Sequence, residues 1–416
     1  MTQPPQDYAR KPHLKITMTH AERRQNPQWK NWKWQMQHRI HTPEALQDYI
    51  QPTPDELEAI RVTDGIFRWN ITPYYASLMD PEDPNCPIRL QMVPRTSEVA
   101  PDIIGVVDPL EEVAHSPVKN LVHNYRDRVA FLVAAECAIY CRYCLRKRMV
   151  GDADFAMNKA ELQEAIDYLA EHPEIRDVLL TGGDPLVFSD RNLAWLLDRL
   201  RAIPHIEIIR IGTRLPVTLP QRLTPELGQL LAQYHPIWLN THFNHPKELT
   251  DEVAEGLEHL HRAGIPIGNQ TVLLKGVNDD PETMKALVEK LVRFRIRPYY
   301  LYQAQLIGGT ASFRTSIEKG LTIIEALQGR TSGYAIPKYV LDTPFGKVPM
   351  TGSYLRGRDG DYVVMNTPRE TLWAEPNPMP EDERHLLGKL PFVERTPDVA
   401  TIALDAEKFE TVLLAE

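Results

Sequence analysis

The chain has 416 residues, and 43% of them are hydrophobic, a share typical of globular proteins that bury a sizeable core. Its net charge of -9 gives no reason to expect binding to nucleic acid or to an anionic membrane. No stretch approaches the length of apolar sequence that spans a membrane, and the polar, proline-rich start is unlike a signal peptide, so we expect a cytoplasmic protein.

The amino-terminal part of the chain shows helical and extended patterns without a repeated unit. Residues 1–25 combine prolines with many charges and are predicted to form a loose leader. Between residues 27 and 76, apolar side chains recur at three- and four-residue steps, and Thr42-Pro43-Glu44 is typical of a helix start. Prolines interrupt the pattern over residues 72–119, which predicts an extended wrapping segment with short helices.

A strand followed by an amphipathic helix is predicted six times in series. The strand-like runs are 129–135, 177–180, 206–211, 237–241, 266–273 and 299–302. The helical patterns are 159–171, 192–202, 225–233, 251–263, 281–294 and 317–327. Six such units predict a parallel sheet with right-handed crossovers, and because barrel closure needs eight, they predict an open, partial (βα)6 barrel. Ligands of these folds bind at the carboxyl ends of the strands.

The remaining carboxyl-terminal sequence has weaker signals. Residues 334–341 form a further apolar run, and residues 361–371 are predicted to form a short strand pair. The acidic, proline-rich residues 375–416 are expected to be peripheral and to cover a neighbouring subunit.

Three of the four cysteines follow the first predicted strand with the spacing C-x3-C-x2-C, at Cys137, Cys141 and Cys144. Three thiolates on one loop can hold three irons of a [4Fe-4S] cluster and leave the fourth iron open to a small molecule. A zinc site completed by a distant histidine is the alternative, although such sites usually use C-x2-C pairs. A disulfide fits less well, because three is an odd number.

The cysteine spacing, with Tyr143 before the third cysteine, resembles the signature of radical S-adenosylmethionine (SAM) enzymes. Residues 32–35, 177–185, 210–214, 238–246, 268–274 and 331–335 resemble lysine 2,3-aminomutase in order and spacing. The similarity covers roughly residues 25–368 and implies an α/β fold of the radical SAM type. The implied organisation is a leader and helical wrapping region (1–120), a partial (βα)6 TIM-like barrel (121–345) and a small extension (346–416).

The resemblance implies three cofactors: a [4Fe-4S] cluster on the three cysteines, SAM, and pyridoxal 5′-phosphate (PLP). Lys347 matches the lysine that carries PLP, and the family has a second phosphate arginine where this chain has Asn124. This difference predicts weaker phosphate binding or recruitment of Arg126. The other positions that match cofactor-binding residues are Tyr125, Arg128 and Tyr302 around the PLP phosphate, and Gly182, Gly183, Asp184, His242 and Gln270.

The implied substrate residues depart from the family at one position. Arg146 matches the arginine that pairs with the substrate α-carboxylate, and Asp342 matches one of two aspartates that hold the distal ammonium of lysine. The second aspartate position holds the uncharged Gln305. One carboxylate with a glutamine carbonyl suits a guanidinium, so L-arginine is a candidate beside L-lysine. Glutamate is disfavoured, because its side-chain carboxylate would face Asp342.

The resemblance therefore implies an isomerase that moves the α-amino group of a cationic L-amino acid to C3. The same chemistry on another amino acid or on a peptidyl lysine is one alternative, and a non-catalytic iron-sulfur or zinc-binding module is another. We expect an electron donor of the flavodoxin or ferredoxin type and a homo-oligomer. We expect no zinc, because no cysteine follows Cys144.

Overall fold

The computed structural model describes residues 18–396 and 398–401, so residues 1–17 of the predicted leader lie outside the described residues. Six short helices form the amino-terminal region: α1 (His20–Arg23), α2 (Trp32–Gln37), α3 (Pro43–Leu46), α4 (Pro54–Val62), α5 (Pro73–Ala76) and α6 (Pro87–Leu90). The predicted helix start at Thr42 is confirmed, because its side chain accepts a hydrogen bond from the Ala45 backbone and Pro43 opens α3. Among the described residues, no helix has the length and apolar character needed to cross a membrane.

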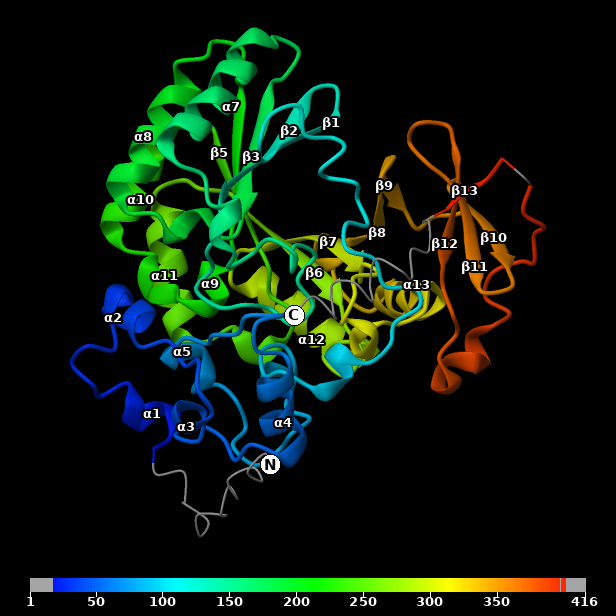
Figure 1. The fold of residues 1–416 in the computed structure, drawn as a ribbon, viewed down its shortest axis with the longest axis horizontal. Coiled ribbons are helices and arrows are strands. Elements are labelled where there is room, and N and C mark those ends of the chain that lie inside the picture. The colour runs from blue at the N-terminus through cyan, green and yellow to red at the C-terminus, as the bar shows by residue number, and fades with distance from the viewer. Residues whose placement is uncertain (1–17, 397, 402–416) are drawn as a thin grey trace, which may run out of the picture.

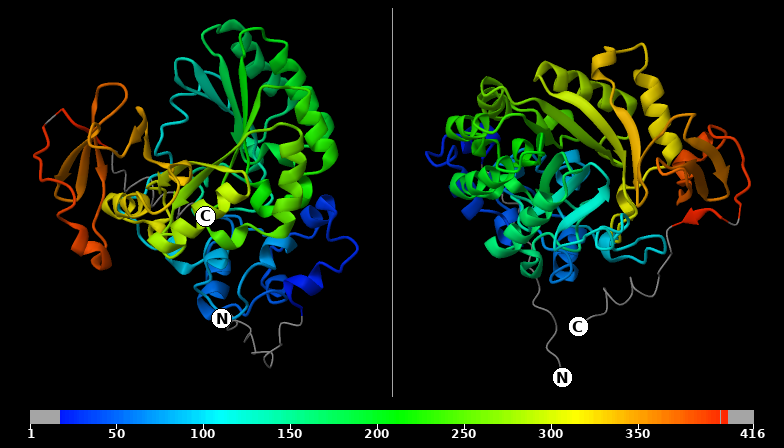
Figure 2. Two further views of the ribbon diagram at one scale, coloured as in Figure 1. Left: turned by 180° about the vertical axis from the view of Figure 1, so that it is seen from behind. Right: turned by 90° about the horizontal axis from the view of Figure 1, so that it is seen from above.

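A nine-stranded sheet forms the centre of the molecule (Figure 1). Its strands lie in chain order: β1 (Leu121–Tyr125), β2 (Arg128–Ala134), β3 (Asp177–Gly182), β4 (Ile208–Gly212), β5 (Ile237–Thr241), β6 (Ile267–Leu273), β7 (Arg297–Gln303), β8 (Lys338–Thr343) and β9 (Gly346–Pro349). Neighbours from β2 to β8 are parallel, whereas β1 and β9 pair antiparallel at the two edges. The sheet curves round and carries its helices on the outer side (Figure 2).

The six predicted strand-helix units are confirmed, and the fold is the expected partial barrel of the radical SAM type. The crossover helices are α7 (Lys159–Glu171), α8 (Asp190–Arg201), α10 (Pro225–Ala232), α11 (Asp251–Arg262), α12 (Pro281–Arg293) and α13 (Ile317–Leu327), with the short α9 (Leu215–Thr218) after β4. Each long helix buries one apolar stripe against the sheet. β1 was not predicted, because three of its five side chains are only half-buried and polar or aromatic.

The strands alternate in burial, which separates an outer face from an inner one. In β3, Val178 and Leu180 are fully buried, whereas Thr181 is half-buried and lies 3.5 Å from the Arg146 guanidinium. Because successive strand side chains point to opposite faces, the half-buried positions line the inside of the barrel. The candidate site is built on that inner face and at the carboxyl ends of the strands.

A second, four-stranded sheet follows the barrel and lies beside α13 (Figures 1 and 2). Its strands are β10 (Leu355–Asp359), β11 (Tyr362–Asn366), β12 (Leu372–Pro376) and β13 (Ala400–Thr401). The prediction of a strand pair within residues 361–371 is wrong: that segment holds only β11 and a turn, and the partners of β11 lie on either side of it.

The start of the acidic region is buried rather than peripheral. The Asn377 side chain accepts a hydrogen bond from the Ile317 backbone, and the Glu383 carboxylate accepts one from Ser316, so both cap the beginning of α13. Arg358 of β10 pairs with the buried Glu318 at 2.8 Å. These contacts fasten the small sheet to the barrel, and they correct the expectation for this part of residues 375–416.

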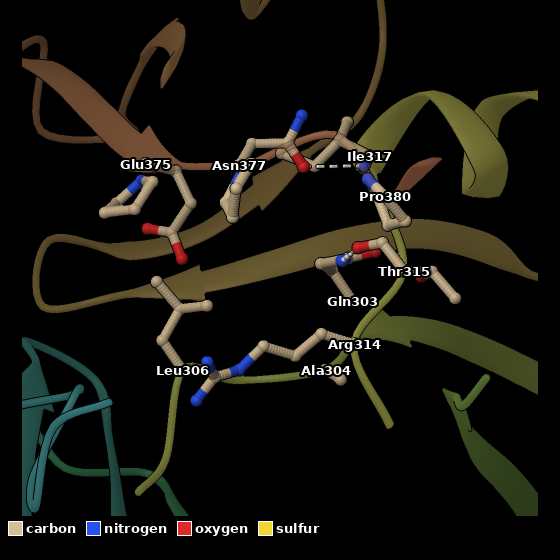
Figure 3. Close-up of a pocket in the computed structure, with 11 residues that line it drawn as sticks. Gln303, Ala304, Leu306, Arg314, Thr315, Ile317, Glu375, Asn377 and Pro380 are labelled. Carbon is tan, nitrogen blue, oxygen red and sulfur yellow. Dashed lines mark hydrogen bonds between the residues drawn. The ribbon is translucent and has the colours of Figure 1, made fainter. Parts of the chain in front are cut away.

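A small cavity of about 30 Å³ lies at this junction, with Glu375 and Arg314 pointing into it from different segments (Figure 3). Burial raises the pKa of Glu375 to about 7, although a hydrogen bond from Trp373 at 2.7 Å and the charge of Arg314 act in the opposite direction. The folded protein therefore binds this proton more tightly than the unfolded chain does.

Glu375→Gln is expected to stabilise the protein above about pH 7 but not below about pH 4.5. Since the carboxyl has a raised pKa in the folded state, its stabilising contribution is complete below its unfolded pKa and is lost as the pH rises through its folded pKa. The whole loss amounts to about 3 kcal/mol. Glutamine cannot ionise and can still accept from Trp373, so it avoids this loss. The measurement is the free energy of unfolding in urea between about pH 4 and about pH 8.

Glu394→Gln, at an exposed position, is the matched control. The difference in unfolding free energy between Glu375→Gln and the unchanged protein should grow with pH, whereas the difference for the control should not. A constant difference for Glu375→Gln would show that Glu375 keeps an ordinary pKa.

Candidate active site

The cysteine loop leaves the carboxyl end of β2, where Cys137, Cys141 and Cys144 are free and half-buried. Burial raises the pKa of the Cys144 thiol to about 11, and the neighbouring Cys141 adds to the rise. A bound iron would stabilise the thiolate and offset that cost. Within the described part of the chain, no three His, Cys, Asp or Glu side chains are grouped as ligands of a single ion. A four-iron cluster instead takes one thiolate on each of three irons, and the three-sulfur donor set fits it.

The amino-terminal region holds this loop in place. Arg142 is buried and donates two hydrogen bonds to Glu98, at 2.9 and 2.7 Å, on the short helix η1 (Thr96–Val99). Its backbone nitrogen donates to the Gln91 carbonyl at 2.9 Å, and Arg39 donates to the Cys137 carbonyl at 3.0 Å. The wrapping segment therefore positions the cysteines. Sequence patterns gave no signal for these partners, which lie far from the loop along the chain.

Arg214 follows β4 and contacts the cysteine loop directly. Its Nη1 lies 2.8 Å from the Cys141 sulfur, and its Nη2 lies 2.9 Å from the fully buried Glu248 carboxylate. Burial alone would lower the pKa of Arg214, but the Cys141 and Glu248 charges hold it well above its ordinary value. The sequence placed Arg214 in a recognisable run but assigned it no role, and Glu248 was missed.

The Gly182-Gly183-Asp184 run lies against the start of the cysteine loop. Gly182 has φ +115°, and a β-carbon there would lie 2.5 Å from the Ala134 carbonyl oxygen; one at Gly183 would overlap the Glu136 carbonyl. Both glycines are required by this close backbone approach. The Asp184 carboxylate accepts hydrogen bonds from the next strand end, at Thr213 and at the Arg214 backbone, both at 2.7 Å. It therefore joins two strand ends.

His242 follows β5 and stacks on Tyr143, with 5.8 Å between ring centroids. Burial, assisted by the charge of Arg214, lowers the pKa of His242 to about 3, so the ring is neutral. Its Nε2 is a buried polar atom without a protein partner in the described residues, as expected for a site that receives a ligand. Gln270 lies deeper on the inner face, where its amide nitrogen is 3.4 Å from the Tyr302 hydroxyl.

Side chains bridge the two edges of the nine-stranded sheet. The Tyr125 hydroxyl accepts a hydrogen bond from the Lys347 backbone nitrogen at 2.8 Å, and the Asn124 side chain donates to the Pro344 carbonyl at 3.0 Å. We call this contact between β1 and residues 344–347 the seam. The Arg128 guanidinium stacks on Tyr125, with 3.8 Å between its central carbon and the ring centroid. Three of the predicted PLP residues are thus adjacent.

Lys347 and Asp342 face each other across the β8–β9 hairpin, where they are directly paired in register. Lys347 Nζ lies 2.9 Å from Asp342 Oδ1 and 5.7 Å from the Tyr302 ring centroid. Burial alone would lower the pKa of Lys347, but the Asp342 carboxylate raises it above its ordinary value. The Gln305 amide nitrogen donates to the Asp342 carbonyl at 3.0 Å. The predicted PLP lysine and two of the predicted substrate residues therefore meet at one place.

Arg146 is engaged by a carboxylate that the sequence analysis did not find. Its Nη2 lies 2.7 Å from Glu112, which also pairs with Arg148 at 3.0 Å. Burial alone would raise the pKa of Glu112, but the two guanidiniums hold it below its ordinary value. Burial alone would lower the pKa of Arg146, but the surrounding negative charges, Glu112 above all, raise it. Arg146 reaches the inner face of the barrel, where its Nη1 lies 3.5 Å from the Thr181 hydroxyl.

Two models of protein families match the chain. The Radical SAM superfamily model covers residues 132–288, which include the cysteine loop and the strand ends up to α12. The Lysine-2,3-aminomutase model covers residues 324–385, which include the β8–β9 hairpin and most of the small sheet.

Three curated relatives are similar over most of their length. L-lysine 2,3-aminomutase of Clostridium subterminale is 48% identical over 81% of this chain and 82% of its own length. L-lysine 2,3-aminomutase of Bacillus subtilis is 47% identical over 84% of this chain and 75% of its own. Glutamate 2,3-aminomutase of Clostridioides difficile is 45% identical over 82% and 81%, respectively.

Proposed function

Because this chain belongs to the lysine 2,3-aminomutase family of radical SAM enzymes, we propose that it moves the α-amino group of L-lysine or L-arginine from C2 to C3. The chain is an isomerase of the aminomutase type, and its family implies a [4Fe-4S] cluster and SAM. The relatives are named for lysine or for glutamate, so their names do not decide the charge of the substrate. The choice of a cationic substrate therefore depends on the residues of the site. That choice rests on one observation, the carboxylate of Asp342 on the inner face.

PLP is the third proposed cofactor, held by Lys347 at the seam, with Tyr125, Arg128 and Tyr302 around it. When bound, the cluster with SAM supplies radical chemistry and PLP supplies an electron-accepting ring. Lys347 must present a neutral amine to react with an aldehyde. Asp342 Oδ1, 2.9 Å from Lys347 Nζ, stabilises the protonated form, so this ion pair has to open before the amine can lose its proton.

The single negative charge of Asp342 is paired with Lys347 in this structure, at 2.9 Å. When Lys347 holds PLP, the Asp342 carboxylate becomes available to bind the distal cation of the substrate amino acid. Gln305 adds an uncharged carbonyl oxygen, because its amide nitrogen already donates to the Asp342 backbone. This pair suits a guanidinium or an ammonium, whereas the side-chain carboxylate of glutamate would meet the negative charge of Asp342.

Arg146 is proposed to bind the substrate α-carboxylate. Glu112 engages its Nε and Nη2, so the guanidinium is oriented with Nη1 toward Thr181 on the inner face. A guanidinium held in one orientation positions a carboxylate better than a mobile one, since less freedom is lost on binding.

The test is product analysis after anaerobic incubation of the reconstituted enzyme with SAM, PLP, a reductant and one amino acid. L-lysine, L-arginine and L-glutamate are supplied in separate tubes, and chromatography separates each β-isomer from its substrate of equal mass. We expect β-lysine or β-arginine and no β-glutamate, because only a cation matches Asp342. Formation of β-glutamate as the main product would contradict the proposal.

Gln305→Asp is the matched variant for the choice between the two cations. The variant places a second carboxylate beside Asp342, and two carboxylates favour the compact ammonium of lysine. The guanidinium of arginine gains less, because one carboxylate and the Gln305 carbonyl already suit it. The ratio of lysine to arginine turnover is expected to rise. An unchanged ratio would mean that Gln305 does not contact the distal group.

A further inference from the structure

The turn between β11 and β12 brings an arginine from the small sheet to the seam. Thr367 organises this turn, since its hydroxyl lies 2.6 Å from that of Thr371 and accepts from the Arg369 backbone at 3.3 Å. The Arg369 guanidinium donates to both the backbone carbonyl and the side-chain oxygen of Asn124 on β1. Residues 245 positions apart in the chain therefore meet at the edge of the barrel.

Arg369 has binding capacity left at this position. Both contacts with Asn124 use its Nη2, so the other donors of the guanidinium fork are not spent on Asn124. Arg369 makes no ion pair with a carboxylate among residues 18–396 and 398–401. It is also exposed, so its side chain can adjust to a ligand.

The surroundings of Arg369 favour an anion. Asn124 precedes Tyr125, whose hydroxyl contacts the Lys347 backbone and whose ring carries the Arg128 guanidinium. The positive charge of Arg128 is paired with Asp127 at 2.7 Å, whereas that of Arg369 is not paired with a carboxylate of the described residues. Two guanidiniums therefore contact β1 residues of the seam, Arg128 at Tyr125 and Arg369 at Asn124, and a guanidinium fork matches the oxygens of a phosphate.

We propose that Arg369 binds the phosphate group of PLP and so makes the small sheet part of the cofactor site. This inference rests on the proposed PLP site at Lys347. Asn124 occupies the position where the resemblance places a phosphate-binding arginine, and Arg369 supplies a guanidinium to that position from another part of the chain. Arg369, which contacts Asn124, is thus an alternative to the recruitment of Arg126 expected from the sequence.

The experiment measures binding of PLP and of pyridoxal, which lacks the phosphate, to the full-length reconstituted protein by equilibrium dialysis. For Arg369→Gln, the Kd for PLP is expected to rise about tenfold or more, the effect of losing one hydrogen bond to a charged group. The Kd for pyridoxal is expected to stay unchanged. Adding Asn124→Arg to this variant should restore PLP affinity, because it returns a guanidinium to the same place.

Arg356→Gln is the matched control, since Arg356 lies on the same sheet and donates a hydrogen bond to Asn366 at 3.1 Å. If Arg369→Gln binds PLP as tightly as the unchanged protein does, the proposed role of Arg369 is wrong, but the proposed PLP site at Lys347 is not affected. An equal loss for PLP and pyridoxal would overturn that role too, because the residue would then act on the fold of the seam. Failure of the unchanged protein to bind either compound would overturn the proposed PLP site itself.

Discussion

Lys347→Ala is expected to lower aminomutase turnover by about 10⁴-fold or more, the scale on which removal of a covalently acting residue reduces catalysis. Lys347 is the lysine that the hairpin register places opposite Asp342 and that Tyr125 fixes through the backbone at 2.8 Å. The variant should also lose PLP during dialysis, because it lacks the amine that is proposed to hold the cofactor. Turnover and bound PLP are measured on the same reconstituted samples.

Lys338→Ala provides the comparison for this result. Lys338 begins β8 and is exposed, so its loss removes a charge from the same hairpin without touching the seam. Iron content should be equal in both variants, since Cys137, Cys141 and Cys144 lie after β2. Retention of PLP and of more than a small part of the turnover by Lys347→Ala would exclude Lys347 as the PLP residue.

Asp342→Asn is expected to reduce kcat/KM for a cationic substrate by about 100-fold, which corresponds to about 3 kcal/mol for one partner of a largely buried charge pair. The amide keeps the size of the carboxylate but removes the negative charge that the distal cation needs. Steady-state kinetics with L-lysine and L-arginine measure this loss. Unchanged kinetics with both would place the distal group of the substrate elsewhere.

The same variant makes a second, independent change at Lys347. The Asp342 carboxylate raises the pKa of Lys347, so its removal should lower that pKa and make the neutral amine available at lower pH. PLP binding followed as a function of pH should therefore begin at lower pH in Asp342→Asn than in the unchanged protein. The pH dependence of PLP binding therefore distinguishes two effects of Asp342→Asn: loss of the contact with the substrate, and loss of the ion pair with Lys347.

Local patterns were sufficient for much of the fold. The six strand-helix units were predicted because period-two and period-3.6 apolar patterns are properties of neighbouring residues. The three cysteines were found for the same reason, since all of them lie within one loop. The strand pair at 361–371 was wrong because both partners of β11 lie outside that segment. The peripheral placement of residue 375 and its neighbours was wrong because no local pattern signals the burial of an acidic segment.

The sequence by itself therefore determined the partial barrel, the cysteine loop and the family, along with positions such as Lys347, Asp342 and Arg146 that match the family. Only the tertiary structure decided what those side chains contact: Glu112 on Arg146, Glu98 on Arg142 and Arg369 on Asn124. These partners lie 34, 44 and 245 residues apart. A contact between residues so far apart in the chain depends on the tertiary fold, which neither the residue types nor their spacing in the sequence specify.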